Sequence, residues 1–167
     1  RAKHSVWRNS HHNVRDNHLS EVKPQESHLM KPLVMAFDPD DLSLRRIGRI
    51  LAWGCRNVDV VLCQSAEQVV RTLLTHPIDV AIIACRREEP CGIELVGSLT
   101  SAEPWSSIPV ISVVDSEDRK SRRQSIDSGA RQIVVKPIHA HDLCSRVLSL
   151  YNLRQLESDL LHHRTEL

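Results

Sequence analysis

The sequence predicts an α/β protein whose core is a doubly wound, five-stranded parallel sheet with helices on both faces. Three observations carry this prediction. Short runs that are apolar throughout alternate five times with segments of helical apolar spacing. Strands buried on both faces lack polar alternation, and parallel strands need a helical crossover between them. The length of 167 residues suits one domain with extra segments at its ends.

Each predicted strand is a short apolar run, and each is followed by a helical pattern. The strands are expected at 33–37, 58–63, 80–85, 109–114 and 132–135. The helices are expected at 41–53, 65–76, 93–99, 119–128 and 140–167. Gly54 and Gly129 follow two of these helices and act as stop signals, and Ser65 is the expected N-cap of another.

Composition narrows the class of protein. The chain is 41% hydrophobic and 26% charged, which is typical of a globular domain. A net charge of +1 and an aromatic content of 3% argue against a nucleic-acid-binding surface. The apolar runs are too short to span a membrane. Five cysteines without paired spacing indicate a reducing, cytoplasmic location and packing roles. No signal peptide is visible, although removal of an upstream segment stays open because the chain begins at Arg1.

Residues 1–31 differ from the rest of the chain. They contain eight apolar residues, carry a net charge of +3 and hold half of the ten histidines. Such a segment buries too little apolar surface to offset its ordering entropy, so it is expected to be a flexible tail. Its histidines fit a solvated tail better than a metal site, because their spacing is not that of a zinc site. These histidines are His4, His11, His12, His18 and His28.

The last helical segment is longer than a compact domain needs. Leucines recur every seven residues at 153, 160 and 167, which is a short coiled-coil pattern. An exposed apolar stripe predicts a parallel dimer through the extension 151–167, whereas a solvated helical tail is the alternative. The expected dimer residues are Leu150, Leu153, Leu156 and Leu160.

In a parallel α/β sheet, ligands bind beyond the carboxyl ends of the strands. Residues 38–41, 84–87, 114–115 and 136–137 are therefore the candidate site residues. The same region carries an ordered set of short motifs. They are Asp38-Pro39-Asp40-Asp41, the strand ending at Ala84, Gly92-Ile93-Glu94-Leu95, Ile108-Pro109-Val110-Ile111, Gly129-Ala130 and Lys136-Pro137.

Through these motifs, residues 32–150 resemble the receiver domain of two-component response regulators. The resemblance implies a flavodoxin-like sheet with strand order 2-1-3-4-5, followed here by an extended C-terminal helix. It also implies a role in phosphorelay signal transduction without enzymatic activity, and a cis peptide bond between Lys136 and Pro137. Family docking faces correspond to residues 119–128 and 132–150.

The family transfers a phosphoryl group to an aspartate beside Mg²⁺, which an acidic pair holds. At the corresponding positions this chain has lost most of that chemistry. Pro39 replaces the second acid, Ala84 the phosphoacceptor and Val114 the hydroxyl residue. Ile133 replaces the switch aromatic. Asp38, Lys136 and Pro137 are what remains.

The sequence therefore predicts a degenerate receiver that is independent of phosphorylation, with no cofactor and no bound Mg²⁺. Asp38 and Asp40 are weak metal candidates, since Asp40 or Asp41 is better explained as a helix N-cap. Lys136 is expected to pair with Asp38 as a relic of the family site.

Cys85 is the only nucleophile beside the degenerate position. Arg86 and Arg87 could lower the pKa of its thiol, whereas a buried packing role is the alternative. The other four cysteines are expected to be packing residues. They are Cys55, Cys63, Cys91 and Cys144.

Three functions remain open at this point. The first is a pseudo-receiver that works through contacts with a protein partner or a downstream output domain. The second is the regulatory part of a larger signalling enzyme whose output domain lies beyond Leu167. The third, a small flavodoxin-like enzyme that binds a nucleotide or flavin, is disfavoured because residues 37–41 contain no glycine-rich phosphate loop.

Overall fold

The computed structural model describes residues 6–7 and 31–165 of the chain. Five parallel strands form the sheet, and a two-residue antiparallel strand lies at one edge. The spatial order is β1-β3-β2-β4-β5-β6. Without β1, this is the predicted order 2-1-3-4-5. The strands are β1 (Val6–Trp7), β2 (Leu33–Phe37), β3 (Asp59–Cys63), β4 (Val80–Ala84), β5 (Val110–Val114) and β6 (Gln132–Val135).

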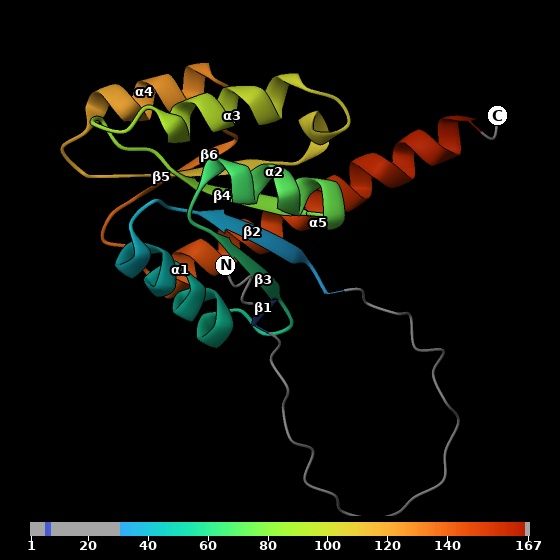
Figure 1. Ribbon diagram of the computed structural model, residues 1–167. Coiled ribbons are helices and arrows are strands. Elements are labelled where there is room, and N and C mark those ends of the chain that lie inside the picture. Colours follow the sequence, from blue (N-terminus) through green and yellow to red (C-terminus); the bar gives the residue numbers. More distant parts are fainter. Residues whose placement is uncertain (1–5, 8–30, 166–167) are drawn as a thin grey trace, which may run out of the picture.

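The helices form one layer on each face of the sheet (Figure 1). α1 and α5 cover one face, and α2, α3 and α4 cover the other. A 3-10 turn, η1 (Trp105–Ser107), precedes β5. The helices are α1 (Asp41–Gly54), α2 (Ala66–Thr75), α3 (Cys91–Ser101), α4 (Arg119–Asp127) and α5 (Ala140–Thr165).

Each central strand contributes side chains to both layers. Along β2, Val34 and Ala36 belong to the apolar cluster beneath α1 and α5, whereas Met35 and Phe37 belong to the cluster beneath α2 and α3. Every residue of β4 and β5 is buried. This double burial explains why the strand sequences are apolar without alternation, and it stabilises the fold through the hydrophobic effect.

The predicted strands and helices are all present, with ends that differ by at most two residues. Asp40 and Ser65 cap α1 and α2 by accepting hydrogen bonds from the amides of Ser43 and Gln68. The Lys136–Pro137 bond is cis, as expected, and Glu103–Pro104 is a second cis bond. Among the described residues, no helix is long and apolar enough to cross a membrane.

The N-terminal segment was expected to be flexible throughout, and that expectation is wrong for two of its residues. Val6 and Trp7 pair with Val61 and Val60 of β3. β3 would otherwise be the edge strand, with unpaired backbone groups that favour strand addition. The five tail histidines lie in residues 1–5 and 8–30, outside the described residues. The expectations of a flexible tail and of no metal site there stay predictions.

The expectation that Cys55 and Cys144 are packing residues is wrong, because the two residues form a disulfide bond. Cys55 follows the last turn of α1, and Cys144 lies near the start of α5. They are 89 residues apart in sequence, so only the packing of α1 beside α5 brings them together. Cys63, Cys85 and Cys91 are free.

Candidate functional site at the carboxyl ends of the strands

The predicted site residues meet at one edge of the sheet, because parallel strands place their carboxyl ends together. Asp38 directly follows β2, and Ala84 is the last residue of β4. Val114 ends β5, and Lys136 directly follows β6. The structure thus brings the four positions together on neighbouring strands, as the sequence predicts.

Asp38 is a fully buried carboxylate that is neutralised by an arginine. One guanidinium nitrogen of Arg86 lies 3.0 Å from Oδ1 and 3.2 Å from Oδ2 of Asp38. The Asp38 side chain is 0% exposed, whereas that of Arg86 is 26% exposed. An isolated buried carboxylate would be costly, so this charge-assisted contact compensates for the lost hydration of Asp38.

Asp40 contributes to the same cluster while it caps a helix. Its Oδ2 accepts a hydrogen bond from the Ser43 amide at 3.1 Å and lies 3.7 Å from the Arg86 guanidinium. The Asp40 amide donates to Oδ1 of Asp38 at 2.9 Å. The N-cap interpretation of Asp40 is therefore confirmed, and both carboxylates face one cation that belongs to the protein itself.

The expected pairing of Lys136 with Asp38 is wrong. Nζ of Lys136 donates to Oγ of Ser43 at 3.3 Å and lies 3.7 Å from Oδ1 of Asp115. Arg86 already occupies both carboxylate oxygens of Asp38, so the lysine is directed toward the loop after β5. The Lys136 side chain is 27% exposed and that of Asp115 is 56% exposed, so this ion pair is accessible to solvent.

The end of β4 carries no nucleophilic or metal-binding side chain. Ala84 is buried, and its carbonyl lies against the start of α3. A Cβ added at Gly92 would collide with the Ala84 carbonyl oxygen, so glycine is needed there for α3 to approach β4. Val114, at the predicted hydroxyl position, is also buried and apolar.

Cys85 fits the packing interpretation. Burial raises the pKa of its thiol, and the hydrogen bond that the thiol donates to Oγ of Ser112, at 3.7 Å, only partly opposes that rise. Arg86 is directed to Asp38 instead of the thiol. Because the thiolate is the nucleophile, a buried thiol with a raised pKa is inert near neutral pH.

Few side-chain oxygens beside the β4 end are free to bind a magnesium ion. Mg²⁺ needs carboxylates whose oxygens are free to bind it, together with water or phosphate oxygens. The guanidinium of Arg86 occupies Asp38, and Ala84 and Pro39 have no side-chain oxygen. Within the described ranges 6–7 and 31–165, no three His, Cys, Asp or Glu side chains cluster to hold a metal.

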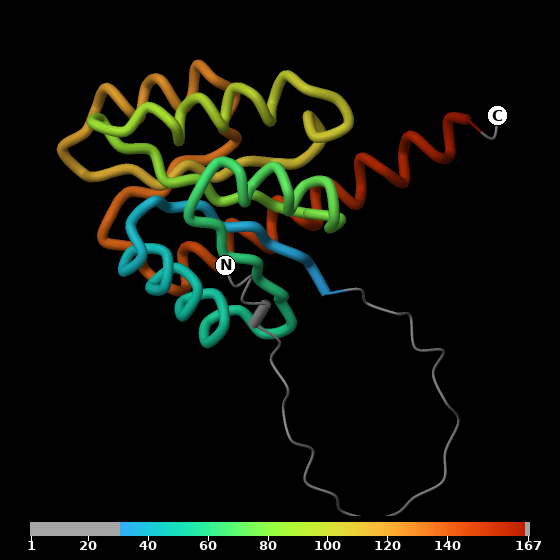
Figure 2. The backbone as a smooth tube through the Cα atoms, viewed as in Figure 1, coloured from blue at the N-terminus to red at the C-terminus, as the bar shows by residue number. Residues whose placement is uncertain are grey.

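The predicted dimer residues do not share one environment. Leu150 is buried against the sheet, so its place in an exposed stripe is wrong. Leu153, Leu156 and Leu160 are 43%, 61% and 64% exposed, and Leu161 is also 64% exposed. The stripe therefore begins one turn later than expected, where α5 leaves the domain (Figure 2).

Two arginines that matter here escaped prediction from the sequence. In the sequence, Arg86 is a neighbour of Cys85, but in the structure β4 lies beside β2, so a cation two residues past β4 reaches Asp38. Arg154 anchors α5 to the loop before β4, since it donates to the carbonyl of Ile78 at 2.8 Å and to Asp79 at 3.3 Å. Both contacts join residues that are distant in sequence, so spacing along the chain gives no signal for them.

The sheet order, the cis Lys-Pro bond and the acidic residue after β2 together define a receiver-like α/β module. Comparison with known proteins agrees. The family model described as "Response regulator receiver domain" matches residues 34–148. The chain therefore belongs to the response regulator receiver domain family, and this membership favours the receiver interpretation over a flavodoxin-like enzyme.

Curated relatives share this part of the chain. The transcriptional regulatory protein KdpE of Mycobacterium tuberculosis is 27% identical over 115 residues, which are 69% of this chain and 49% of KdpE. The response regulator PleD of Caulobacter vibrioides is 28% identical over 114 residues, which are 68% of this chain and 24% of PleD. The chain thus spans about half or less of the length of these relatives.

Solved structures confirm the fold. A putative response regulator from Chloroflexus aurantiacus superposes with a TM-score of 0.66 at 18% identity, covering 73% of this chain and 99% of that chain. A CheY-like receiver domain protein from Methanospirillum hungatei gives a TM-score of 0.63 at 18% identity, with 75% and 98% covered.

Proposed function

We propose that this receiver domain signals without being phosphorylated and without enzymatic activity, through contacts with other proteins. The observation that carries the proposal is the contact of Arg86 with both carboxylate oxygens of Asp38, beside a β4 strand that ends in Ala84. By resemblance, Ala84 stands where the family has its phosphoacceptor, and Asp38 where the family has an acid that holds Mg²⁺. An alanine methyl group cannot accept a phosphoryl group.

The electrostatics support the same proposal. The family needs a divalent cation because it neutralises phosphoryl oxygens and carboxylates together. Here the positive charge beside Asp38 and Asp40 is covalently part of the chain, and it is present whether or not a phosphoryl donor arrives. With no phosphoryl acceptor at Ala84 and a permanent cation at Arg86, the net charge at this edge of the sheet would stay the same throughout a phosphorylation cycle.

Phosphoryl transfer is the direct test. The full chain is incubated with acetyl phosphate and Mg²⁺, and its intact mass is recorded. The expected result is an unchanged mass at every incubation time. A mass gain of one phosphoryl group that hydroxylamine removes would refute the proposal, because hydroxylamine cleaves acyl phosphates. The matched control is an Ala84→Asp, Arg86→Ala double variant, in which the first substitution places an aspartate at the acceptor position and the second removes the cation beside Asp38.

The output is proposed to pass through the C-terminal part of α5. Arg154 and the Arg131–Glu157 pair, 3.9 Å apart, fasten the helix as it passes the end of the sheet. Beyond that point α5 projects away from the domain (Figure 1). Leu153, Leu156 and Leu160 follow the three-and-four spacing of a coiled coil, which suits a parallel dimer of modest stability.

Sedimentation tests this part. The wild type is expected to associate at about 100 μM, a concentration at which micromolar contacts are populated. A Leu153→Ala, Leu160→Ala variant is expected to be monomeric with an unchanged circular dichroism spectrum. Leu74→Ala removes a leucine on α2 that is at least as exposed as Leu153 and Leu160, and it is expected to leave association unchanged. A monomeric wild type would contradict the dimer and favour a solvated helical extension.

A second candidate is a regulatory receiver joined to an output domain beyond Leu167. The observation in its favour is that the chain covers only 49% of KdpE, 24% of PleD and 9% of hybrid signal transduction histidine kinase D from Dictyostelium discoideum. Parallel α5 helices would hold two such domains side by side. Reading the coding sequence downstream of Leu167 decides this, since an immediate stop codon excludes the candidate.

A further inference from the structure

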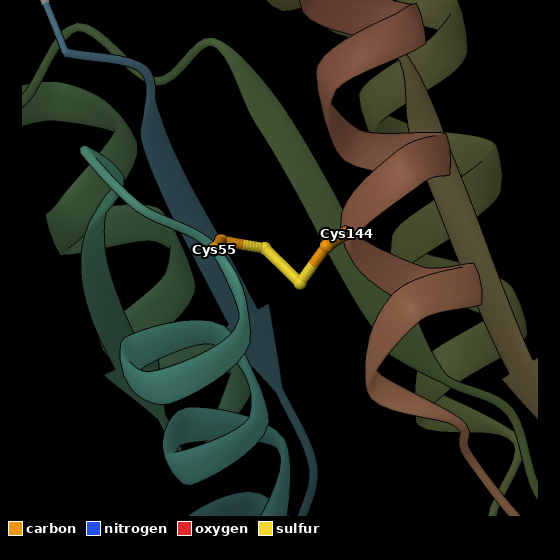
Figure 3. The surroundings of a disulfide bond; sticks show 2 residues. All are labelled: Cys55 and Cys144. Atoms are coloured by element: carbon orange, nitrogen blue, oxygen red, sulfur yellow. A yellow bond between two sulfur atoms is a disulfide. The ribbon is translucent and has the colours of Figure 1, made fainter.

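The Cys55–Cys144 bond joins the end of α1 to the beginning of α5. Cys55 is the C-cap residue of α1, and its amide donates to the Leu51 carbonyl at 3.1 Å. The two Cα atoms are 5.4 Å apart, within the range that disulfides require. Figure 3 shows the bond spanning the space between the two helices. It is the direct covalent link between the sheet domain's first helix and the helix that projects from it.

The surroundings of the bond let the two helices approach closely. Gly54 directly precedes Cys55, and a Cβ added there would lie 3.2 Å from Sγ of Cys144 and 3.2 Å from Cβ of Ala140. A side chain at this position would push against α5. The absence of a side chain at Gly54 therefore lets the end of α1 lie close to α5.

The fold does not depend on the bond alone. Leu143, Val147 and Leu150 bury one face of α5 in the apolar cluster that α1 also joins. Burial of these three apolar side chains is expected to hold α5 on the sheet when the two cysteines are reduced. Opening the bond would loosen the first turns of α5 without unfolding the domain.

The other cysteines do not compete for this pair. Cys63 and Cys85 are buried, and burial raises the pKa of each thiol, although a hydrogen bond with Thr72 partly opposes the rise at Cys63. Cys91 is partly exposed, but it lies at the start of α3, on the opposite face of the sheet. Exchange among the five cysteines within one molecule is therefore blocked by the sheet.

The bond lies just beneath the surface. Cys55 is 1% exposed and Cys144 is 6% exposed, so a reagent does not reach them in the resting structure. Exposed residues lie close to both cysteines: Gly54 and Arg56 flank Cys55, and His141 lies three residues before Cys144, within one turn of α5. Opening of one helical turn at either end suffices for access, and such local openings cost less than global unfolding.

We propose that Cys55–Cys144 is a reversible redox site that sets how firmly α5 is attached to α1. A thiolate of a dithiol reductant attacks Sγ of Cys144, forms a mixed disulfide and releases Cys55 as a thiolate, which takes up a proton. The second thiolate of the reductant then displaces Cys144, which is protonated in turn. The reductant becomes a disulfide, and two electrons pass to the protein. A disulfide oxidant runs the same steps backward.

A titration with defined ratios of reduced and oxidised glutathione tests the site in the folded full chain. Samples are quenched in acid, unfolded and alkylated, and their intact mass is measured. The oxidised protein offers three free thiols and the reduced protein five. The expected result is a single transition from three to five alkyl groups. Three alkyl groups at every ratio would overturn the proposal, because the bond would then be permanent. Five alkyl groups at every ratio would also overturn it, because the bond would then not form.

Cysteine variants identify the residues in that transition. In Cys91→Ser the same transition is expected with one alkyl group fewer, since Cys91 does not take part. In Cys55→Ser, Cys144→Ser the transition is expected to disappear. A transition that persists in this double variant would assign the redox chemistry to other cysteines and overturn the proposal.

Hydrogen exchange tests what the bond controls. Amides in the first turns of α5 are expected to exchange about tenfold faster or more in the reduced protein, whereas β4 amides stay unchanged. Equal exchange rates of the α5 amides in the oxidised and reduced protein would show that the bond does not stabilise the attachment of α5. The mass and exchange measurements do not depend on the proposed dimer; only an effect of the redox state on association would rest on it. Failure of the redox proposal can therefore be distinguished from failure of the dimer proposal.

Discussion

The interior of the sheet and its carboxyl-terminal edge obey different constraints. In the interior, β4 and β5 are buried residue by residue, and the apolar clusters on both faces are continuous. At the edge, the same strands end in Ala84 and Val114, while a buried carboxylate is matched by Arg86. Packing along the strands and polar contacts at their ends therefore involve different residues, so the apolar interior does not depend on which side chains stand at the strand ends.

The largest effect is expected in the interior. Ile82 is fully buried at the centre of β4, so Ile82→Ala removes transfer energy and leaves a cavity. The free energy of unfolding is expected to fall by about 2–5 kcal/mol, measured by urea denaturation. A loss below about 1 kcal/mol would show that the interior is less tightly packed than its burial indicates.

An intermediate effect is expected for the ion pair at the edge. A double-mutant cycle with Asp38→Ala and Arg86→Ala is expected to give a coupling energy of about 1–3 kcal/mol, because Asp38 is buried and Arg86 only partly exposed. The matched control is Asp41 with Arg45, which is equally short at 3.0 Å but exposed. Its coupling is expected to be about 0.5 kcal/mol or less. Equal couplings would remove the distinction between the buried cluster and an ordinary surface pair.

The smallest effect is expected at Lys136. Its partner Asp115 is more than half exposed at a distance of 3.7 Å. Asp115→Asn is expected to change the free energy of unfolding by about 0.5 kcal/mol or less. A loss as large as that of Arg86→Ala would mean that the relic lysine, and not Arg86, organises this edge.

The difference between interior and edge also explains what the sequence could predict. The strands were predictable because doubly buried strands are apolar throughout, and Asp40 and Ser65 were predictable as caps because their signal is local. The family resemblance located Asp38, Ala84 and Lys136 at one edge. Their actual partners were not predictable, because Arg86 reaches Asp38 across 48 residues.

Two further features depended on tertiary structure. The Cys55–Cys144 bond links residues separated by 89 positions, and its spacing matches no recognisable pattern. Leu150 has the same heptad-related spacing as the exposed leucines of α5, but it lies over the sheet and is buried. The width of the sheet determines the residue at which α5 stops contacting the domain. The helical periodicity of the sequence cannot predict that residue.

The most direct test of the account is a magnesium titration followed by amide chemical shifts. In the wild type, the amides of Asp38, Asp40 and Asp41 are expected to show no saturable change through low-millimolar Mg²⁺, because Arg86 already neutralises Asp38. The Ala84→Asp, Arg86→Ala variant restores a carboxylate and removes the cation, and it is expected to saturate in the same range. Saturable binding by the wild type, with shifts centred on Asp38 and Asp40, would contradict the claim that the protein's own arginine replaces the metal.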